Sequence, residues 1–204
     1  MSVQNVSTNP IIIGLTGGIA SGKTTASRYF EQLNIPVIDS DLIVKNLWES
    51  NEEMITQVES FFGFSIRTYE DRKKLSHLIF HDPTKREALN HMIHPYVFQI
   101  IENLKNTYAN QKYIIIDMPL LIEVGYQELC DYILVVYVDL ETQIQRLMMR
   151  DGSIRSEALA RIHSQLLLEE KIKHADIILN NNQSKEDLYQ QIDAFLRGIE
   201  YEKQ

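Results

Sequence analysis

The stretch Gly17–Thr24, which reads GGIASGKT, could bind the phosphates of a nucleotide. It matches the pattern G-x-x-x-x-G-K-[ST], in which glycines let the backbone curl until consecutive N–H groups point at phosphate oxygens. A helix that follows such a loop presents the positive end of its dipole to the same charge. Lys23 would then reach the β- and γ-phosphates, and the Thr24 hydroxyl would hold a magnesium ion. This phosphate loop therefore predicts a site for a nucleoside triphosphate.

The residues around the phosphate loop fit a strand followed by a helix. The apolar run Ile11–Ile13 lies just before it, as expected of a buried parallel strand. Residues 25–33 place Ala26, Tyr29 and Phe30 at helical spacing. A glycine turn without a ligand is the alternative, but the strand and helix on its two sides favour phosphate binding. The predicted nucleotide contacts are Gly17, Gly18, Ile19, Ala20, Ser21, Gly22, Lys23, Thr24 and Thr25.

Two carboxylates follow the next predicted strand. Residues 37–38 are apolar and lead into Asp39, Ser40 and Asp41. Ligands of open α/β sheets bind just beyond the carboxyl ends of the strands, so this acidic pair is a candidate site. The alternative is that Asp39 or Ser40 only caps the next helix.

A further carboxylate, Asp117, belongs to the strand predicted over residues 113–118. At this position a carboxylate can orient the water around a magnesium ion that the nucleotide brings. We therefore expect Thr24 and Asp117 to be the metal-binding residues. A polar residue at the exposed end of a strand is the alternative.

Two arginines, Arg146 and Arg150, lie four residues apart at the end of the helix predicted over residues 141–149, Arg150 directly after its last residue, and so on one face. Residues 151–153 break this helix, and another helix is predicted from Ser156 to about Ala175. Cations that close over a transferring phosphoryl group supply much of the stabilisation in such reactions. We therefore predict a mobile lid, with exposed surface arginines as the alternative.

A helical block separates the early strands from the later ones. Helices are predicted over residues 42–48, 52–62, 72–80 and 83–108, the last bent or interrupted near His94-Pro95. Such a block is typical of a helical insertion on the acceptor side of a nucleotide-binding fold, although ordinary packing would explain it equally. Its charged run Asp71–Lys74 is either a solvated face or a contact for an anionic substrate.

Five strand signals occur, near residues 11, 37, 114, 133 and 177, with helices between them. This alternation predicts an α/β fold with a five-stranded parallel sheet flanked by helices. We expect one domain over residues 10–204, made of a core (10–41, 111–140 and 175–204), a helical insertion (42–110) and a lid (141–174). Residues 1–9 are polar, and we expect a disordered tail there.

Composition excludes several classes of protein. The net charge of −8 over 204 residues argues against a non-specific nucleic-acid binder, which neutralises phosphates with Lys and Arg. No window of 18 apolar residues occurs, and the first residues lack a basic and an apolar targeting region. We therefore expect a cytoplasmic protein that binds neither nucleic acid nor membrane.

Several stretches in a fixed order resemble the dephospho-coenzyme A kinase family from Ile13 to about Ser184. They are GLTGGIASGKTTAS from Gly14, VIDSD from Val37, DRKKLSHLIF from Asp71, LNHMIHP from Leu89, MPLLIE from Met118, ETQIQRLMMRD from Glu141, and Gln165-x5-Lys171-x3-Ala175-Asp176. Only the first is specific alone, and the order and spacing of the others carry the resemblance.

The resemblance implies a P-loop core of the nucleoside-monophosphate-kinase type, a helical acceptor domain and a lid. It implies transfer of the γ-phosphoryl group of ATP to the ribose 3′-hydroxyl of dephospho-coenzyme A, the last step of coenzyme A synthesis. By position, the catalytic residues would be Asp41, Lys23, Arg146 and Arg150, and the acceptor-binding residues Asp41, His94 and Pro95. Asp41 would be the base or the positioning group for the acceptor hydroxyl.

Three positions depart from the usual pattern of that family. Ala20 replaces the common third glycine of the phosphate loop, which is tolerable if φ there is negative. The usual Pro-Gly pair after the Asp-x-Asp segment is missing at Trp48–Asn51. The Asn-Gly after the final strand is here Asn182-Gln183, although backbone groups of residues 180–182 could still contact an adenine.

Two other functions are alternatives to this one. A kinase of another small hydroxyl or monophosphate acceptor shares the fold and stays open. A nucleotide-binding switch is disfavoured, because the sequence contains neither N-K-x-D nor D-x-x-G. We expect ATP and Mg²⁺ as cofactors, dephospho-coenzyme A as the small-molecule partner, and a monomer or weak homo-oligomer.

Overall fold

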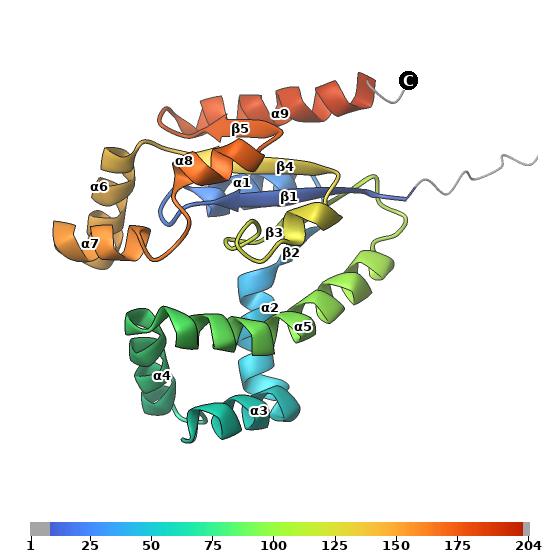
Figure 1. Cartoon of the computed structure of the whole chain (residues 1–204). Coiled ribbons are helices and arrows are strands. Elements are labelled where there is room, and N and C mark those ends of the chain that lie inside the picture. The colour runs from blue at the N-terminus through green and yellow to red at the C-terminus, as the bar shows by residue number, and fades with distance from the viewer. Residues whose placement is uncertain (1–8, 202–204) are drawn as a thin grey trace, which may run out of the picture. The chain divides into compact units, whose positions relative to one another are not determined.

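The computed structural model describes residues 9–201, which form two compact units (Figure 1). One unit contains the chain up to Ile38 and the chain from Thr107 onward, and the other spans Asp39–Asn106. The expected tail over residues 1–9 lies, apart from Asn9, outside the described residues. Within residues 9–201, no helix is both long and apolar enough to cross a membrane.

A five-stranded sheet forms the centre of the first unit. Its strands are β1 (Ile11–Gly17), β2 (Val37–Asp39), β3 (Tyr113–Asp117), β4 (Tyr132–Tyr137) and β5 (Ile177–Asn180). They lie in the order β2-β3-β1-β4-β5 and run parallel. The predicted five-stranded parallel sheet flanked by helices is therefore confirmed. Because β1 is central, the phosphate loop begins in the middle of the carboxyl edge of the sheet.

Helices α1 (Lys23–Gln32) and α9 (Lys185–Tyr201) cover one face of this sheet (Figure 1). Alternate residues of a strand point to the same face, and Ile11, Ile13 and Leu15 of β1 are buried in one cluster with Phe30 of α1 and Ile192 of α9. This apolar cluster is the main core, and it fixes α1 at the end of the phosphate loop.

The segment that follows β3 covers part of the other face. It forms hydrogen-bonded turns over residues 119–125 and the 3₁₀-helix η1 (Tyr126–Leu129). Gly14 of β1 faces this segment, since a Cβ there would lie 2.7 Å from Leu121 Cδ1 and 2.9 Å from Cys130 Sγ. A larger residue at this position would displace the ends of these two side chains.

The predicted single helix from Ser156 to about Ala175 is wrong. After α6 (Leu140–Asp151), the chain forms α7 (Arg155–Ile162), α8 (Leu168–Lys171) and the 3₁₀-helix η2 (Ile172–His174). Between α7 and α8, the Ser164 hydroxyl donates to Arg161 O at 2.7 Å, and Leu166 N donates to Glu123 Oε1 at 3.1 Å. These bonds take the place of helical ones and end α7.

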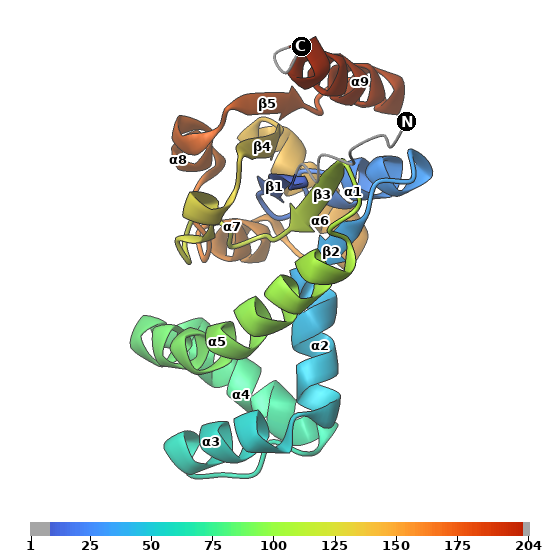
Figure 2. The same ribbon diagram turned by 90° about the vertical axis from the view of Figure 1, so that its right-hand side faces the viewer.

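Four helices make up the second unit, shown in cyan to green in Figure 2. They are α2 (Ser40–Ser50), α3 (Glu52–Phe62), α4 (Tyr69–His81) and α5 (Pro83–Thr107), close to the predicted ranges. Of the bend or interruption expected near His94-Pro95, the interruption is absent, because α5 continues through Pro95. Pro95 is exposed, whereas Leu89, Ile93, Val97 and Ile101, spaced four residues apart on one face of α5, are buried on both sides of it.

Two residues of the charged run Asp71–Lys74 form hydrogen bonds that stabilise the second unit. Arg72 donates to Trp48 O at 2.7 Å and to Ile66 O at 3.3 Å, and so joins the end of α2 to the segment before α4. Asp71 and Thr68 form a reciprocal capping box at the start of α4. These two charged side chains therefore have structural partners.

Candidate active site

The phosphate loop connects the carboxyl end of β1 to α1, as the sequence predicts. Gly22 precedes the first residue of α1 and has a φ of 96°, in the left-handed region that favours glycine. A side chain here would also collide, because a Cβ would lie 2.0 Å from Asn181 Nδ2. The turn into α1 therefore requires glycine at this position.

Ala20 also lies in the left-handed region, with a φ of 59°. The negative φ that would make alanine unstrained at this position is therefore absent, and a residue other than glycine pays roughly 1 kcal/mol or more for this conformation. Ala20 and Ile19 pack against an apolar cluster of α6 and α7, here called the lid cluster. Its buried members are Ile144, Leu147, Ala158 and Ile162. This contact offsets part of the strain.

Lys23 and Asp117 meet beside the phosphate loop. The Lys23 ammonium group forms an ion pair with one oxygen of the Asp117 carboxylate, and the other oxygen accepts a hydrogen bond from the Ser27 hydroxyl. The side chains of Lys23 and Asp117 are only 15% and 5% exposed. Both charged groups are largely buried, and each is paired with the other, as buried charges must be.

The groups that could hold a magnesium ion are few. Thr24 is exposed in the first turn of α1 beside Lys23, and Thr25 follows it with its amide donating to Gly22 O at 2.8 Å. Over residues 9–201, no group of three or more His, Cys, Asp or Glu side chains could hold a metal. Mg²⁺ is usually held by one or two protein groups together with phosphates and water. The Thr24 hydroxyl and the Asp117 carboxylate fit an ion that arrives with a nucleotide.

Two glutamines that the sequence analysis did not select hold the phosphate loop at Ile19. Gln143 Nε2 of α6 donates to Ile19 O at 2.6 Å, and Ile19 N donates to Gln165 Oε1 at 3.2 Å. Gln143 is 4% exposed, and a Cβ at Gly18 would lie 2.6 Å from its Nε2. The sequence signal for each was its place in a stretch that resembles the family, ETQIQRLMMRD for Gln143 and the spaced motif that begins at Gln165. The segment 141–174 is thus fastened to the loop by side-chain amides.

Asn181 and Arg146 hold the loop at Ser21. Asn181 Nδ2 donates to Ser21 O at 2.8 Å, and the Arg146 guanidinium donates to Asn181 O at 2.9 Å and to Ser21 O at 3.5 Å. Arg150 instead donates to both oxygens of Asp151, at 2.8 and 3.1 Å, and these bonds raise the pKa of its guanidinium. Of the two predicted lid arginines, only Arg146 contacts the phosphate loop.

The backbone after β5, considered for adenine contacts, is already bonded within the protein. The amides of Asn180, Asn181 and Asn182 donate to Gln191 Oε1, Tyr137 O and Asn180 Oδ1, at 2.9, 2.8 and 3.0 Å. An adenine contact through any of these three amides would have to replace an existing hydrogen bond.

In the second unit, Asp39 and Asp41 have different surroundings. Asp39 Oδ1 accepts hydrogen bonds from Asp41 N at 2.8 Å and from Leu42 N at 3.1 Å, so Asp39 caps α2. The capping alternative is therefore correct for Asp39. Asp41 lies exposed in the first turn of α2, which leaves its carboxylate accessible to solvent.

His94 and Pro95 are neighbours on α5, also in the second unit. The His94 ring is half-buried and stacks on Phe98, with ring centroids 5.7 Å apart. Burial lowers the pKa of His94, and the nearby His91 lowers it further. The neutral imidazole is therefore favoured, and it can both donate and accept a hydrogen bond.

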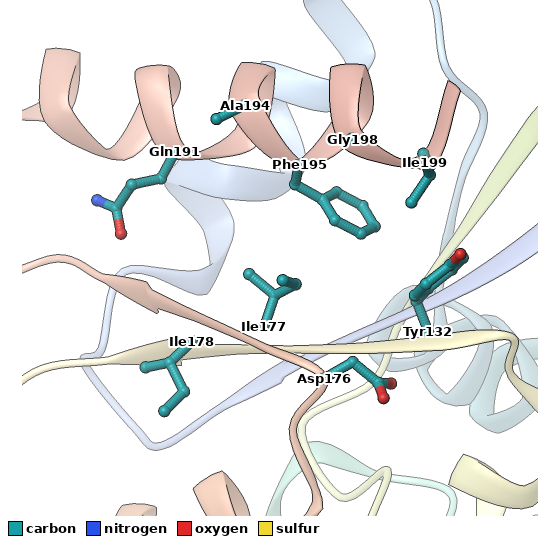
Figure 3. Close-up of a pocket in the computed structure, with 9 residues that line it drawn as sticks. All are labelled: Tyr132, Asp176, Ile177, Ile178, Gln191, Ala194, Phe195, Gly198 and Ile199. Carbon is teal, nitrogen blue, oxygen red and sulfur yellow. The ribbon is translucent and has the colours of Figure 1, made fainter. Parts of the chain in front are cut away.

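A pocket of about 520 Å³ lies between α9 and the strands β4 and β5 (Figure 3). Figure 3 shows Phe195 reaching from α9 toward the strands, and its ring meets that of Tyr132 edge-on at 5.5 Å. The polar side chains at the pocket are already bonded, since Asp176 accepts from Ile133 N and Gln191 bonds both backbone groups of Asn180. This pocket is separate from the phosphate loop.

Comparisons with known proteins agree on one family. The family model described as dephospho-CoA kinase (CoaE) matches residues 11–187. A curated dephospho-CoA kinase of Bacillus cereus (strain ZK / E33L) is 40% identical over 192 residues, which cover 92% of this chain and 96% of that protein.

Two solved structures resemble the chain over its length. TT1252 from Thermus thermophilus has a TM-score of 0.79 and 33% identity, covering 94% of this chain and 98% of that one. A dephospho-CoA kinase from Campylobacter jejuni has a TM-score of 0.66 and 29% identity, covering 95% and 98%. With a family match over most of its length and these relatives, the chain belongs to the dephospho-CoA kinase family.

Proposed function

We propose that this chain transfers the γ-phosphoryl group of ATP to the ribose 3′-hydroxyl of dephospho-coenzyme A, which yields coenzyme A and ADP and completes coenzyme A synthesis. The family match over residues 11–187 carries the proposal. The phosphate loop at the amino end of α1 supports it, because such a loop suits the phosphates of the donor.

On the donor side, Lys23 would bind the β- and γ-phosphates in exchange for part of its ion pair with Asp117. Thr24 and Asp117 would hold Mg²⁺ together with the phosphate oxygens. Bound magnesium would neutralise charge that develops on those oxygens. Because Asp117 now pairs with Lys23, nucleotide binding would rearrange this ion pair.

On the acceptor side, the helical unit Asp39–Asn106 would bind dephospho-coenzyme A. Asp41 would accept the hydrogen bond of the 3′-hydroxyl and take up its proton as the new phosphate ester forms. Its exposure in the first turn of α2 supports this role. His94 and Pro95 would shape the acceptor site from α5.

Residues 141–174 would form the lid. Arg146 and Arg150 would close on the γ-phosphate and exclude water, which limits wasteful hydrolysis. For Arg150 this requires exchange of its present partner, Asp151. We further propose that the reaction takes place in the cytoplasm and that the chain acts as a monomer or a weak homo-oligomer.

The test is an ADP-release assay with ATP and Mg²⁺ and a panel of acceptors: dephospho-coenzyme A, adenosine, shikimate and nucleoside monophosphates. We expect release above the no-acceptor background with dephospho-coenzyme A alone. Release with another acceptor and none with dephospho-coenzyme A would refute the assignment and leave a P-loop kinase of different specificity.

The role of Asp41 is tested with Asp41→Asn and a matched carboxylate variant of the same unit, Asp82→Asn. Asp82 caps α5, with Oδ1 accepting from Lys85 N at 3.1 Å and Oδ2 pairing with Lys85 Nζ at 3.2 Å. We expect Asp41→Asn to bind ATP normally and to lose transfer about 10²-fold or more, the range for a general base. Full transfer by Asp41→Asn would exclude it as the base, and an equal loss in Asp82→Asn would point to a folding defect.

A further inference from the structure

Lys171 is a fully buried lysine that has no part in the reaction described above. It ends α8, and its side chain is 0% exposed. Its ammonium group donates to Pro119 O at 2.5 Å and to the Glu123 carboxylate at 2.9 and 3.0 Å. Burying a lysine is costly unless its charge and donors are matched, and here three close oxygens match them.

The carbonyl that Lys171 binds lies between two parts of the donor site. Pro119 O also accepts a hydrogen bond from the buried hydroxyl of Thr16 at 3.0 Å. Thr16 directly precedes Gly17, where the phosphate loop begins, and Pro119 follows Asp117 by two residues. Lys171 therefore ties together the ends of β1 and β3, at the points where the loop and the metal-side carboxylate leave the sheet.

The carboxylate that Lys171 binds extends the same connection to the lid side. Glu123 Oε1 also accepts from Leu166 N at 3.1 Å, and the preceding residue, Gln165, accepts from Ile19 N at 3.2 Å. A continuous chain of contacts thus runs from Lys171 through Glu123 and residues 165–166 to the phosphate loop. Loss of the ammonium group would release both Pro119 O and the Glu123 carboxylate.

Lys171 and Lys23 have different electrostatic partners. Burial lowers the pKa of Lys171, the Glu123 carboxylate opposes this, and the charge of Lys23 lowers it further. The two ammonium groups are therefore within electrostatic reach of each other. Because Glu123 balances Lys171, the charge of Lys23 stays available to Asp117 and to an incoming phosphate.

We propose that Lys171 is a positioning residue for nucleotide binding: by fixing Pro119 and Glu123 it holds Asp117 in place and, through Gln165, holds the phosphate-loop backbone at Ile19 in the conformation that binds the triphosphate and its metal. The inference rests on the proposed function only in taking ATP as the ligand. It does not depend on which acceptor receives the phosphoryl group, because Lys171 and its partners all lie in the first unit.

The experiment measures the Kd of Mg²⁺-ATP by calorimetry, together with the KM values for ATP and dephospho-coenzyme A. The full chain is compared with Lys171→Met, with the double variant Lys171→Met/Glu123→Gln, and with Lys173→Met. Lys173 lies two residues away, is 65% exposed and pairs with Glu170 on the surface, so it is the matched control. Thermal midpoints are recorded for every variant.

We expect Lys171→Met to raise the Kd and the KM for ATP at least tenfold, with the KM for dephospho-coenzyme A within twofold and Lys173→Met unchanged. The double variant removes the unpaired Glu123 charge, so its thermal midpoint should move back toward that of the parent chain. Its Kd for Mg²⁺-ATP should stay raised, because Pro119 O still lacks its ammonium donor.

A purely structural role predicts a different result. If the double variant recovers both thermal midpoint and nucleotide affinity, or if the Kd changes less than twofold in Lys171→Met, the proposal is wrong. Should Lys171→Met fail to fold, the double variant decides the question by the same Kd criterion. Failure of the proposed function would look different, since the parent chain would bind Mg²⁺-ATP without phosphorylating dephospho-coenzyme A.

Discussion

Asp117 holds Lys23 beside the phosphate loop through a largely buried ion pair, and Ser27 donates to the second oxygen of the same carboxylate. The pair keeps the lysine of the loop neutralised before any phosphate arrives. A triphosphate must therefore compete with Asp117 for the ammonium group. A magnesium ion would favour that exchange, because it offers the carboxylate a new cationic partner.

Asp117→Asn is therefore expected to weaken the binding of Mg²⁺ at the phosphate loop. The amide cannot balance a metal charge, so the Mg²⁺ concentration for half-maximal activity should rise, with a loss of about 10- to 100-fold in metal affinity or activity. A Mg²⁺ titration at fixed ATP measures it. Asp131→Asn is the control, since Asp131 Oδ2 only accepts from Ile12 N at the other end of β1. An unchanged Mg²⁺ titration in Asp117→Asn would remove it from the metal site.

Arg146→Ala is expected to lower the turnover number by about 10³-fold or more, the range found for arginines that stabilise a transferring phosphoryl group. In the structure Arg146 already contacts the phosphate loop at Ser21 O. Steady-state kinetics with saturating ATP and acceptor measure the effect. Arg155→Ala is the control, because Arg155 forms an exposed pair with Glu141, and such pairs contribute little. A normal turnover number for Arg146→Ala would exclude the assigned role.

The sheet and the phosphate loop could be predicted because their signals are local. Each buried parallel strand is a short apolar run, such as that of residues 113–116, and the loop follows a strict glycine and lysine spacing. The four-helix block could be predicted as well, because strand signals stop between residue 42 and about residue 110, and every helix end lies within three residues of the predicted one.

The residues that fasten the loop could not be predicted, because their roles depend on contacts between distant segments. Gln143, Gln165 and Asn181 are neutral amides, and they act on the loop over 124 to 160 residues of sequence. The end of α7 was missed for the same reason. Glu123, 43 residues earlier in the chain, accepts from Leu166 N and ends a helix that local propensity would continue.

The half-buried ring of His94 predicts a loss of stability in acid. Its pKa in the folded chain is lowered by burial and by His91, so the unfolded chain takes up this proton at a higher pH than the folded one. The free energy of unfolding therefore falls as the pH drops below the ordinary histidine value of about 6.5, until the folded chain is protonated as well.

His94→Gln is expected to reduce the fall in thermal midpoint between pH 7.5 and pH 5, since glutamine does not titrate. His91→Gln should reduce it by a smaller amount, because it removes only the repulsion that acts on His94. Thermal unfolding followed by circular dichroism at the two pH values gives both numbers. The same fall in His94→Gln as in the parent chain would contradict the assignment.

At Ala20, the free-energy cost of the left-handed backbone can be measured separately from the contribution of side-chain packing. Asn34 has the same φ of 59° but is exposed, whereas Ala20 packs against the lid cluster. Where only the left-handed conformation matters, changing alanine to glycine should raise the free energy of unfolding by roughly 1 kcal/mol. At Ala20, loss of the methyl contact, worth up to about 0.8 kcal/mol when fully buried, should cancel much of that gain.

The comparison therefore needs Ala20→Gly against the parent chain, and Asn34→Gly against Asn34→Ala. Denaturant unfolding gives the free energy of unfolding for each, and we expect the alanine-to-glycine gain to be larger at position 34 than at position 20. Equal gains would mean that the Ala20 methyl contributes nothing through the lid cluster. A larger gain at position 34 would show that the contact between the phosphate loop and helices α6 and α7 offsets the strain in the loop, so that a residue other than glycine can be kept there.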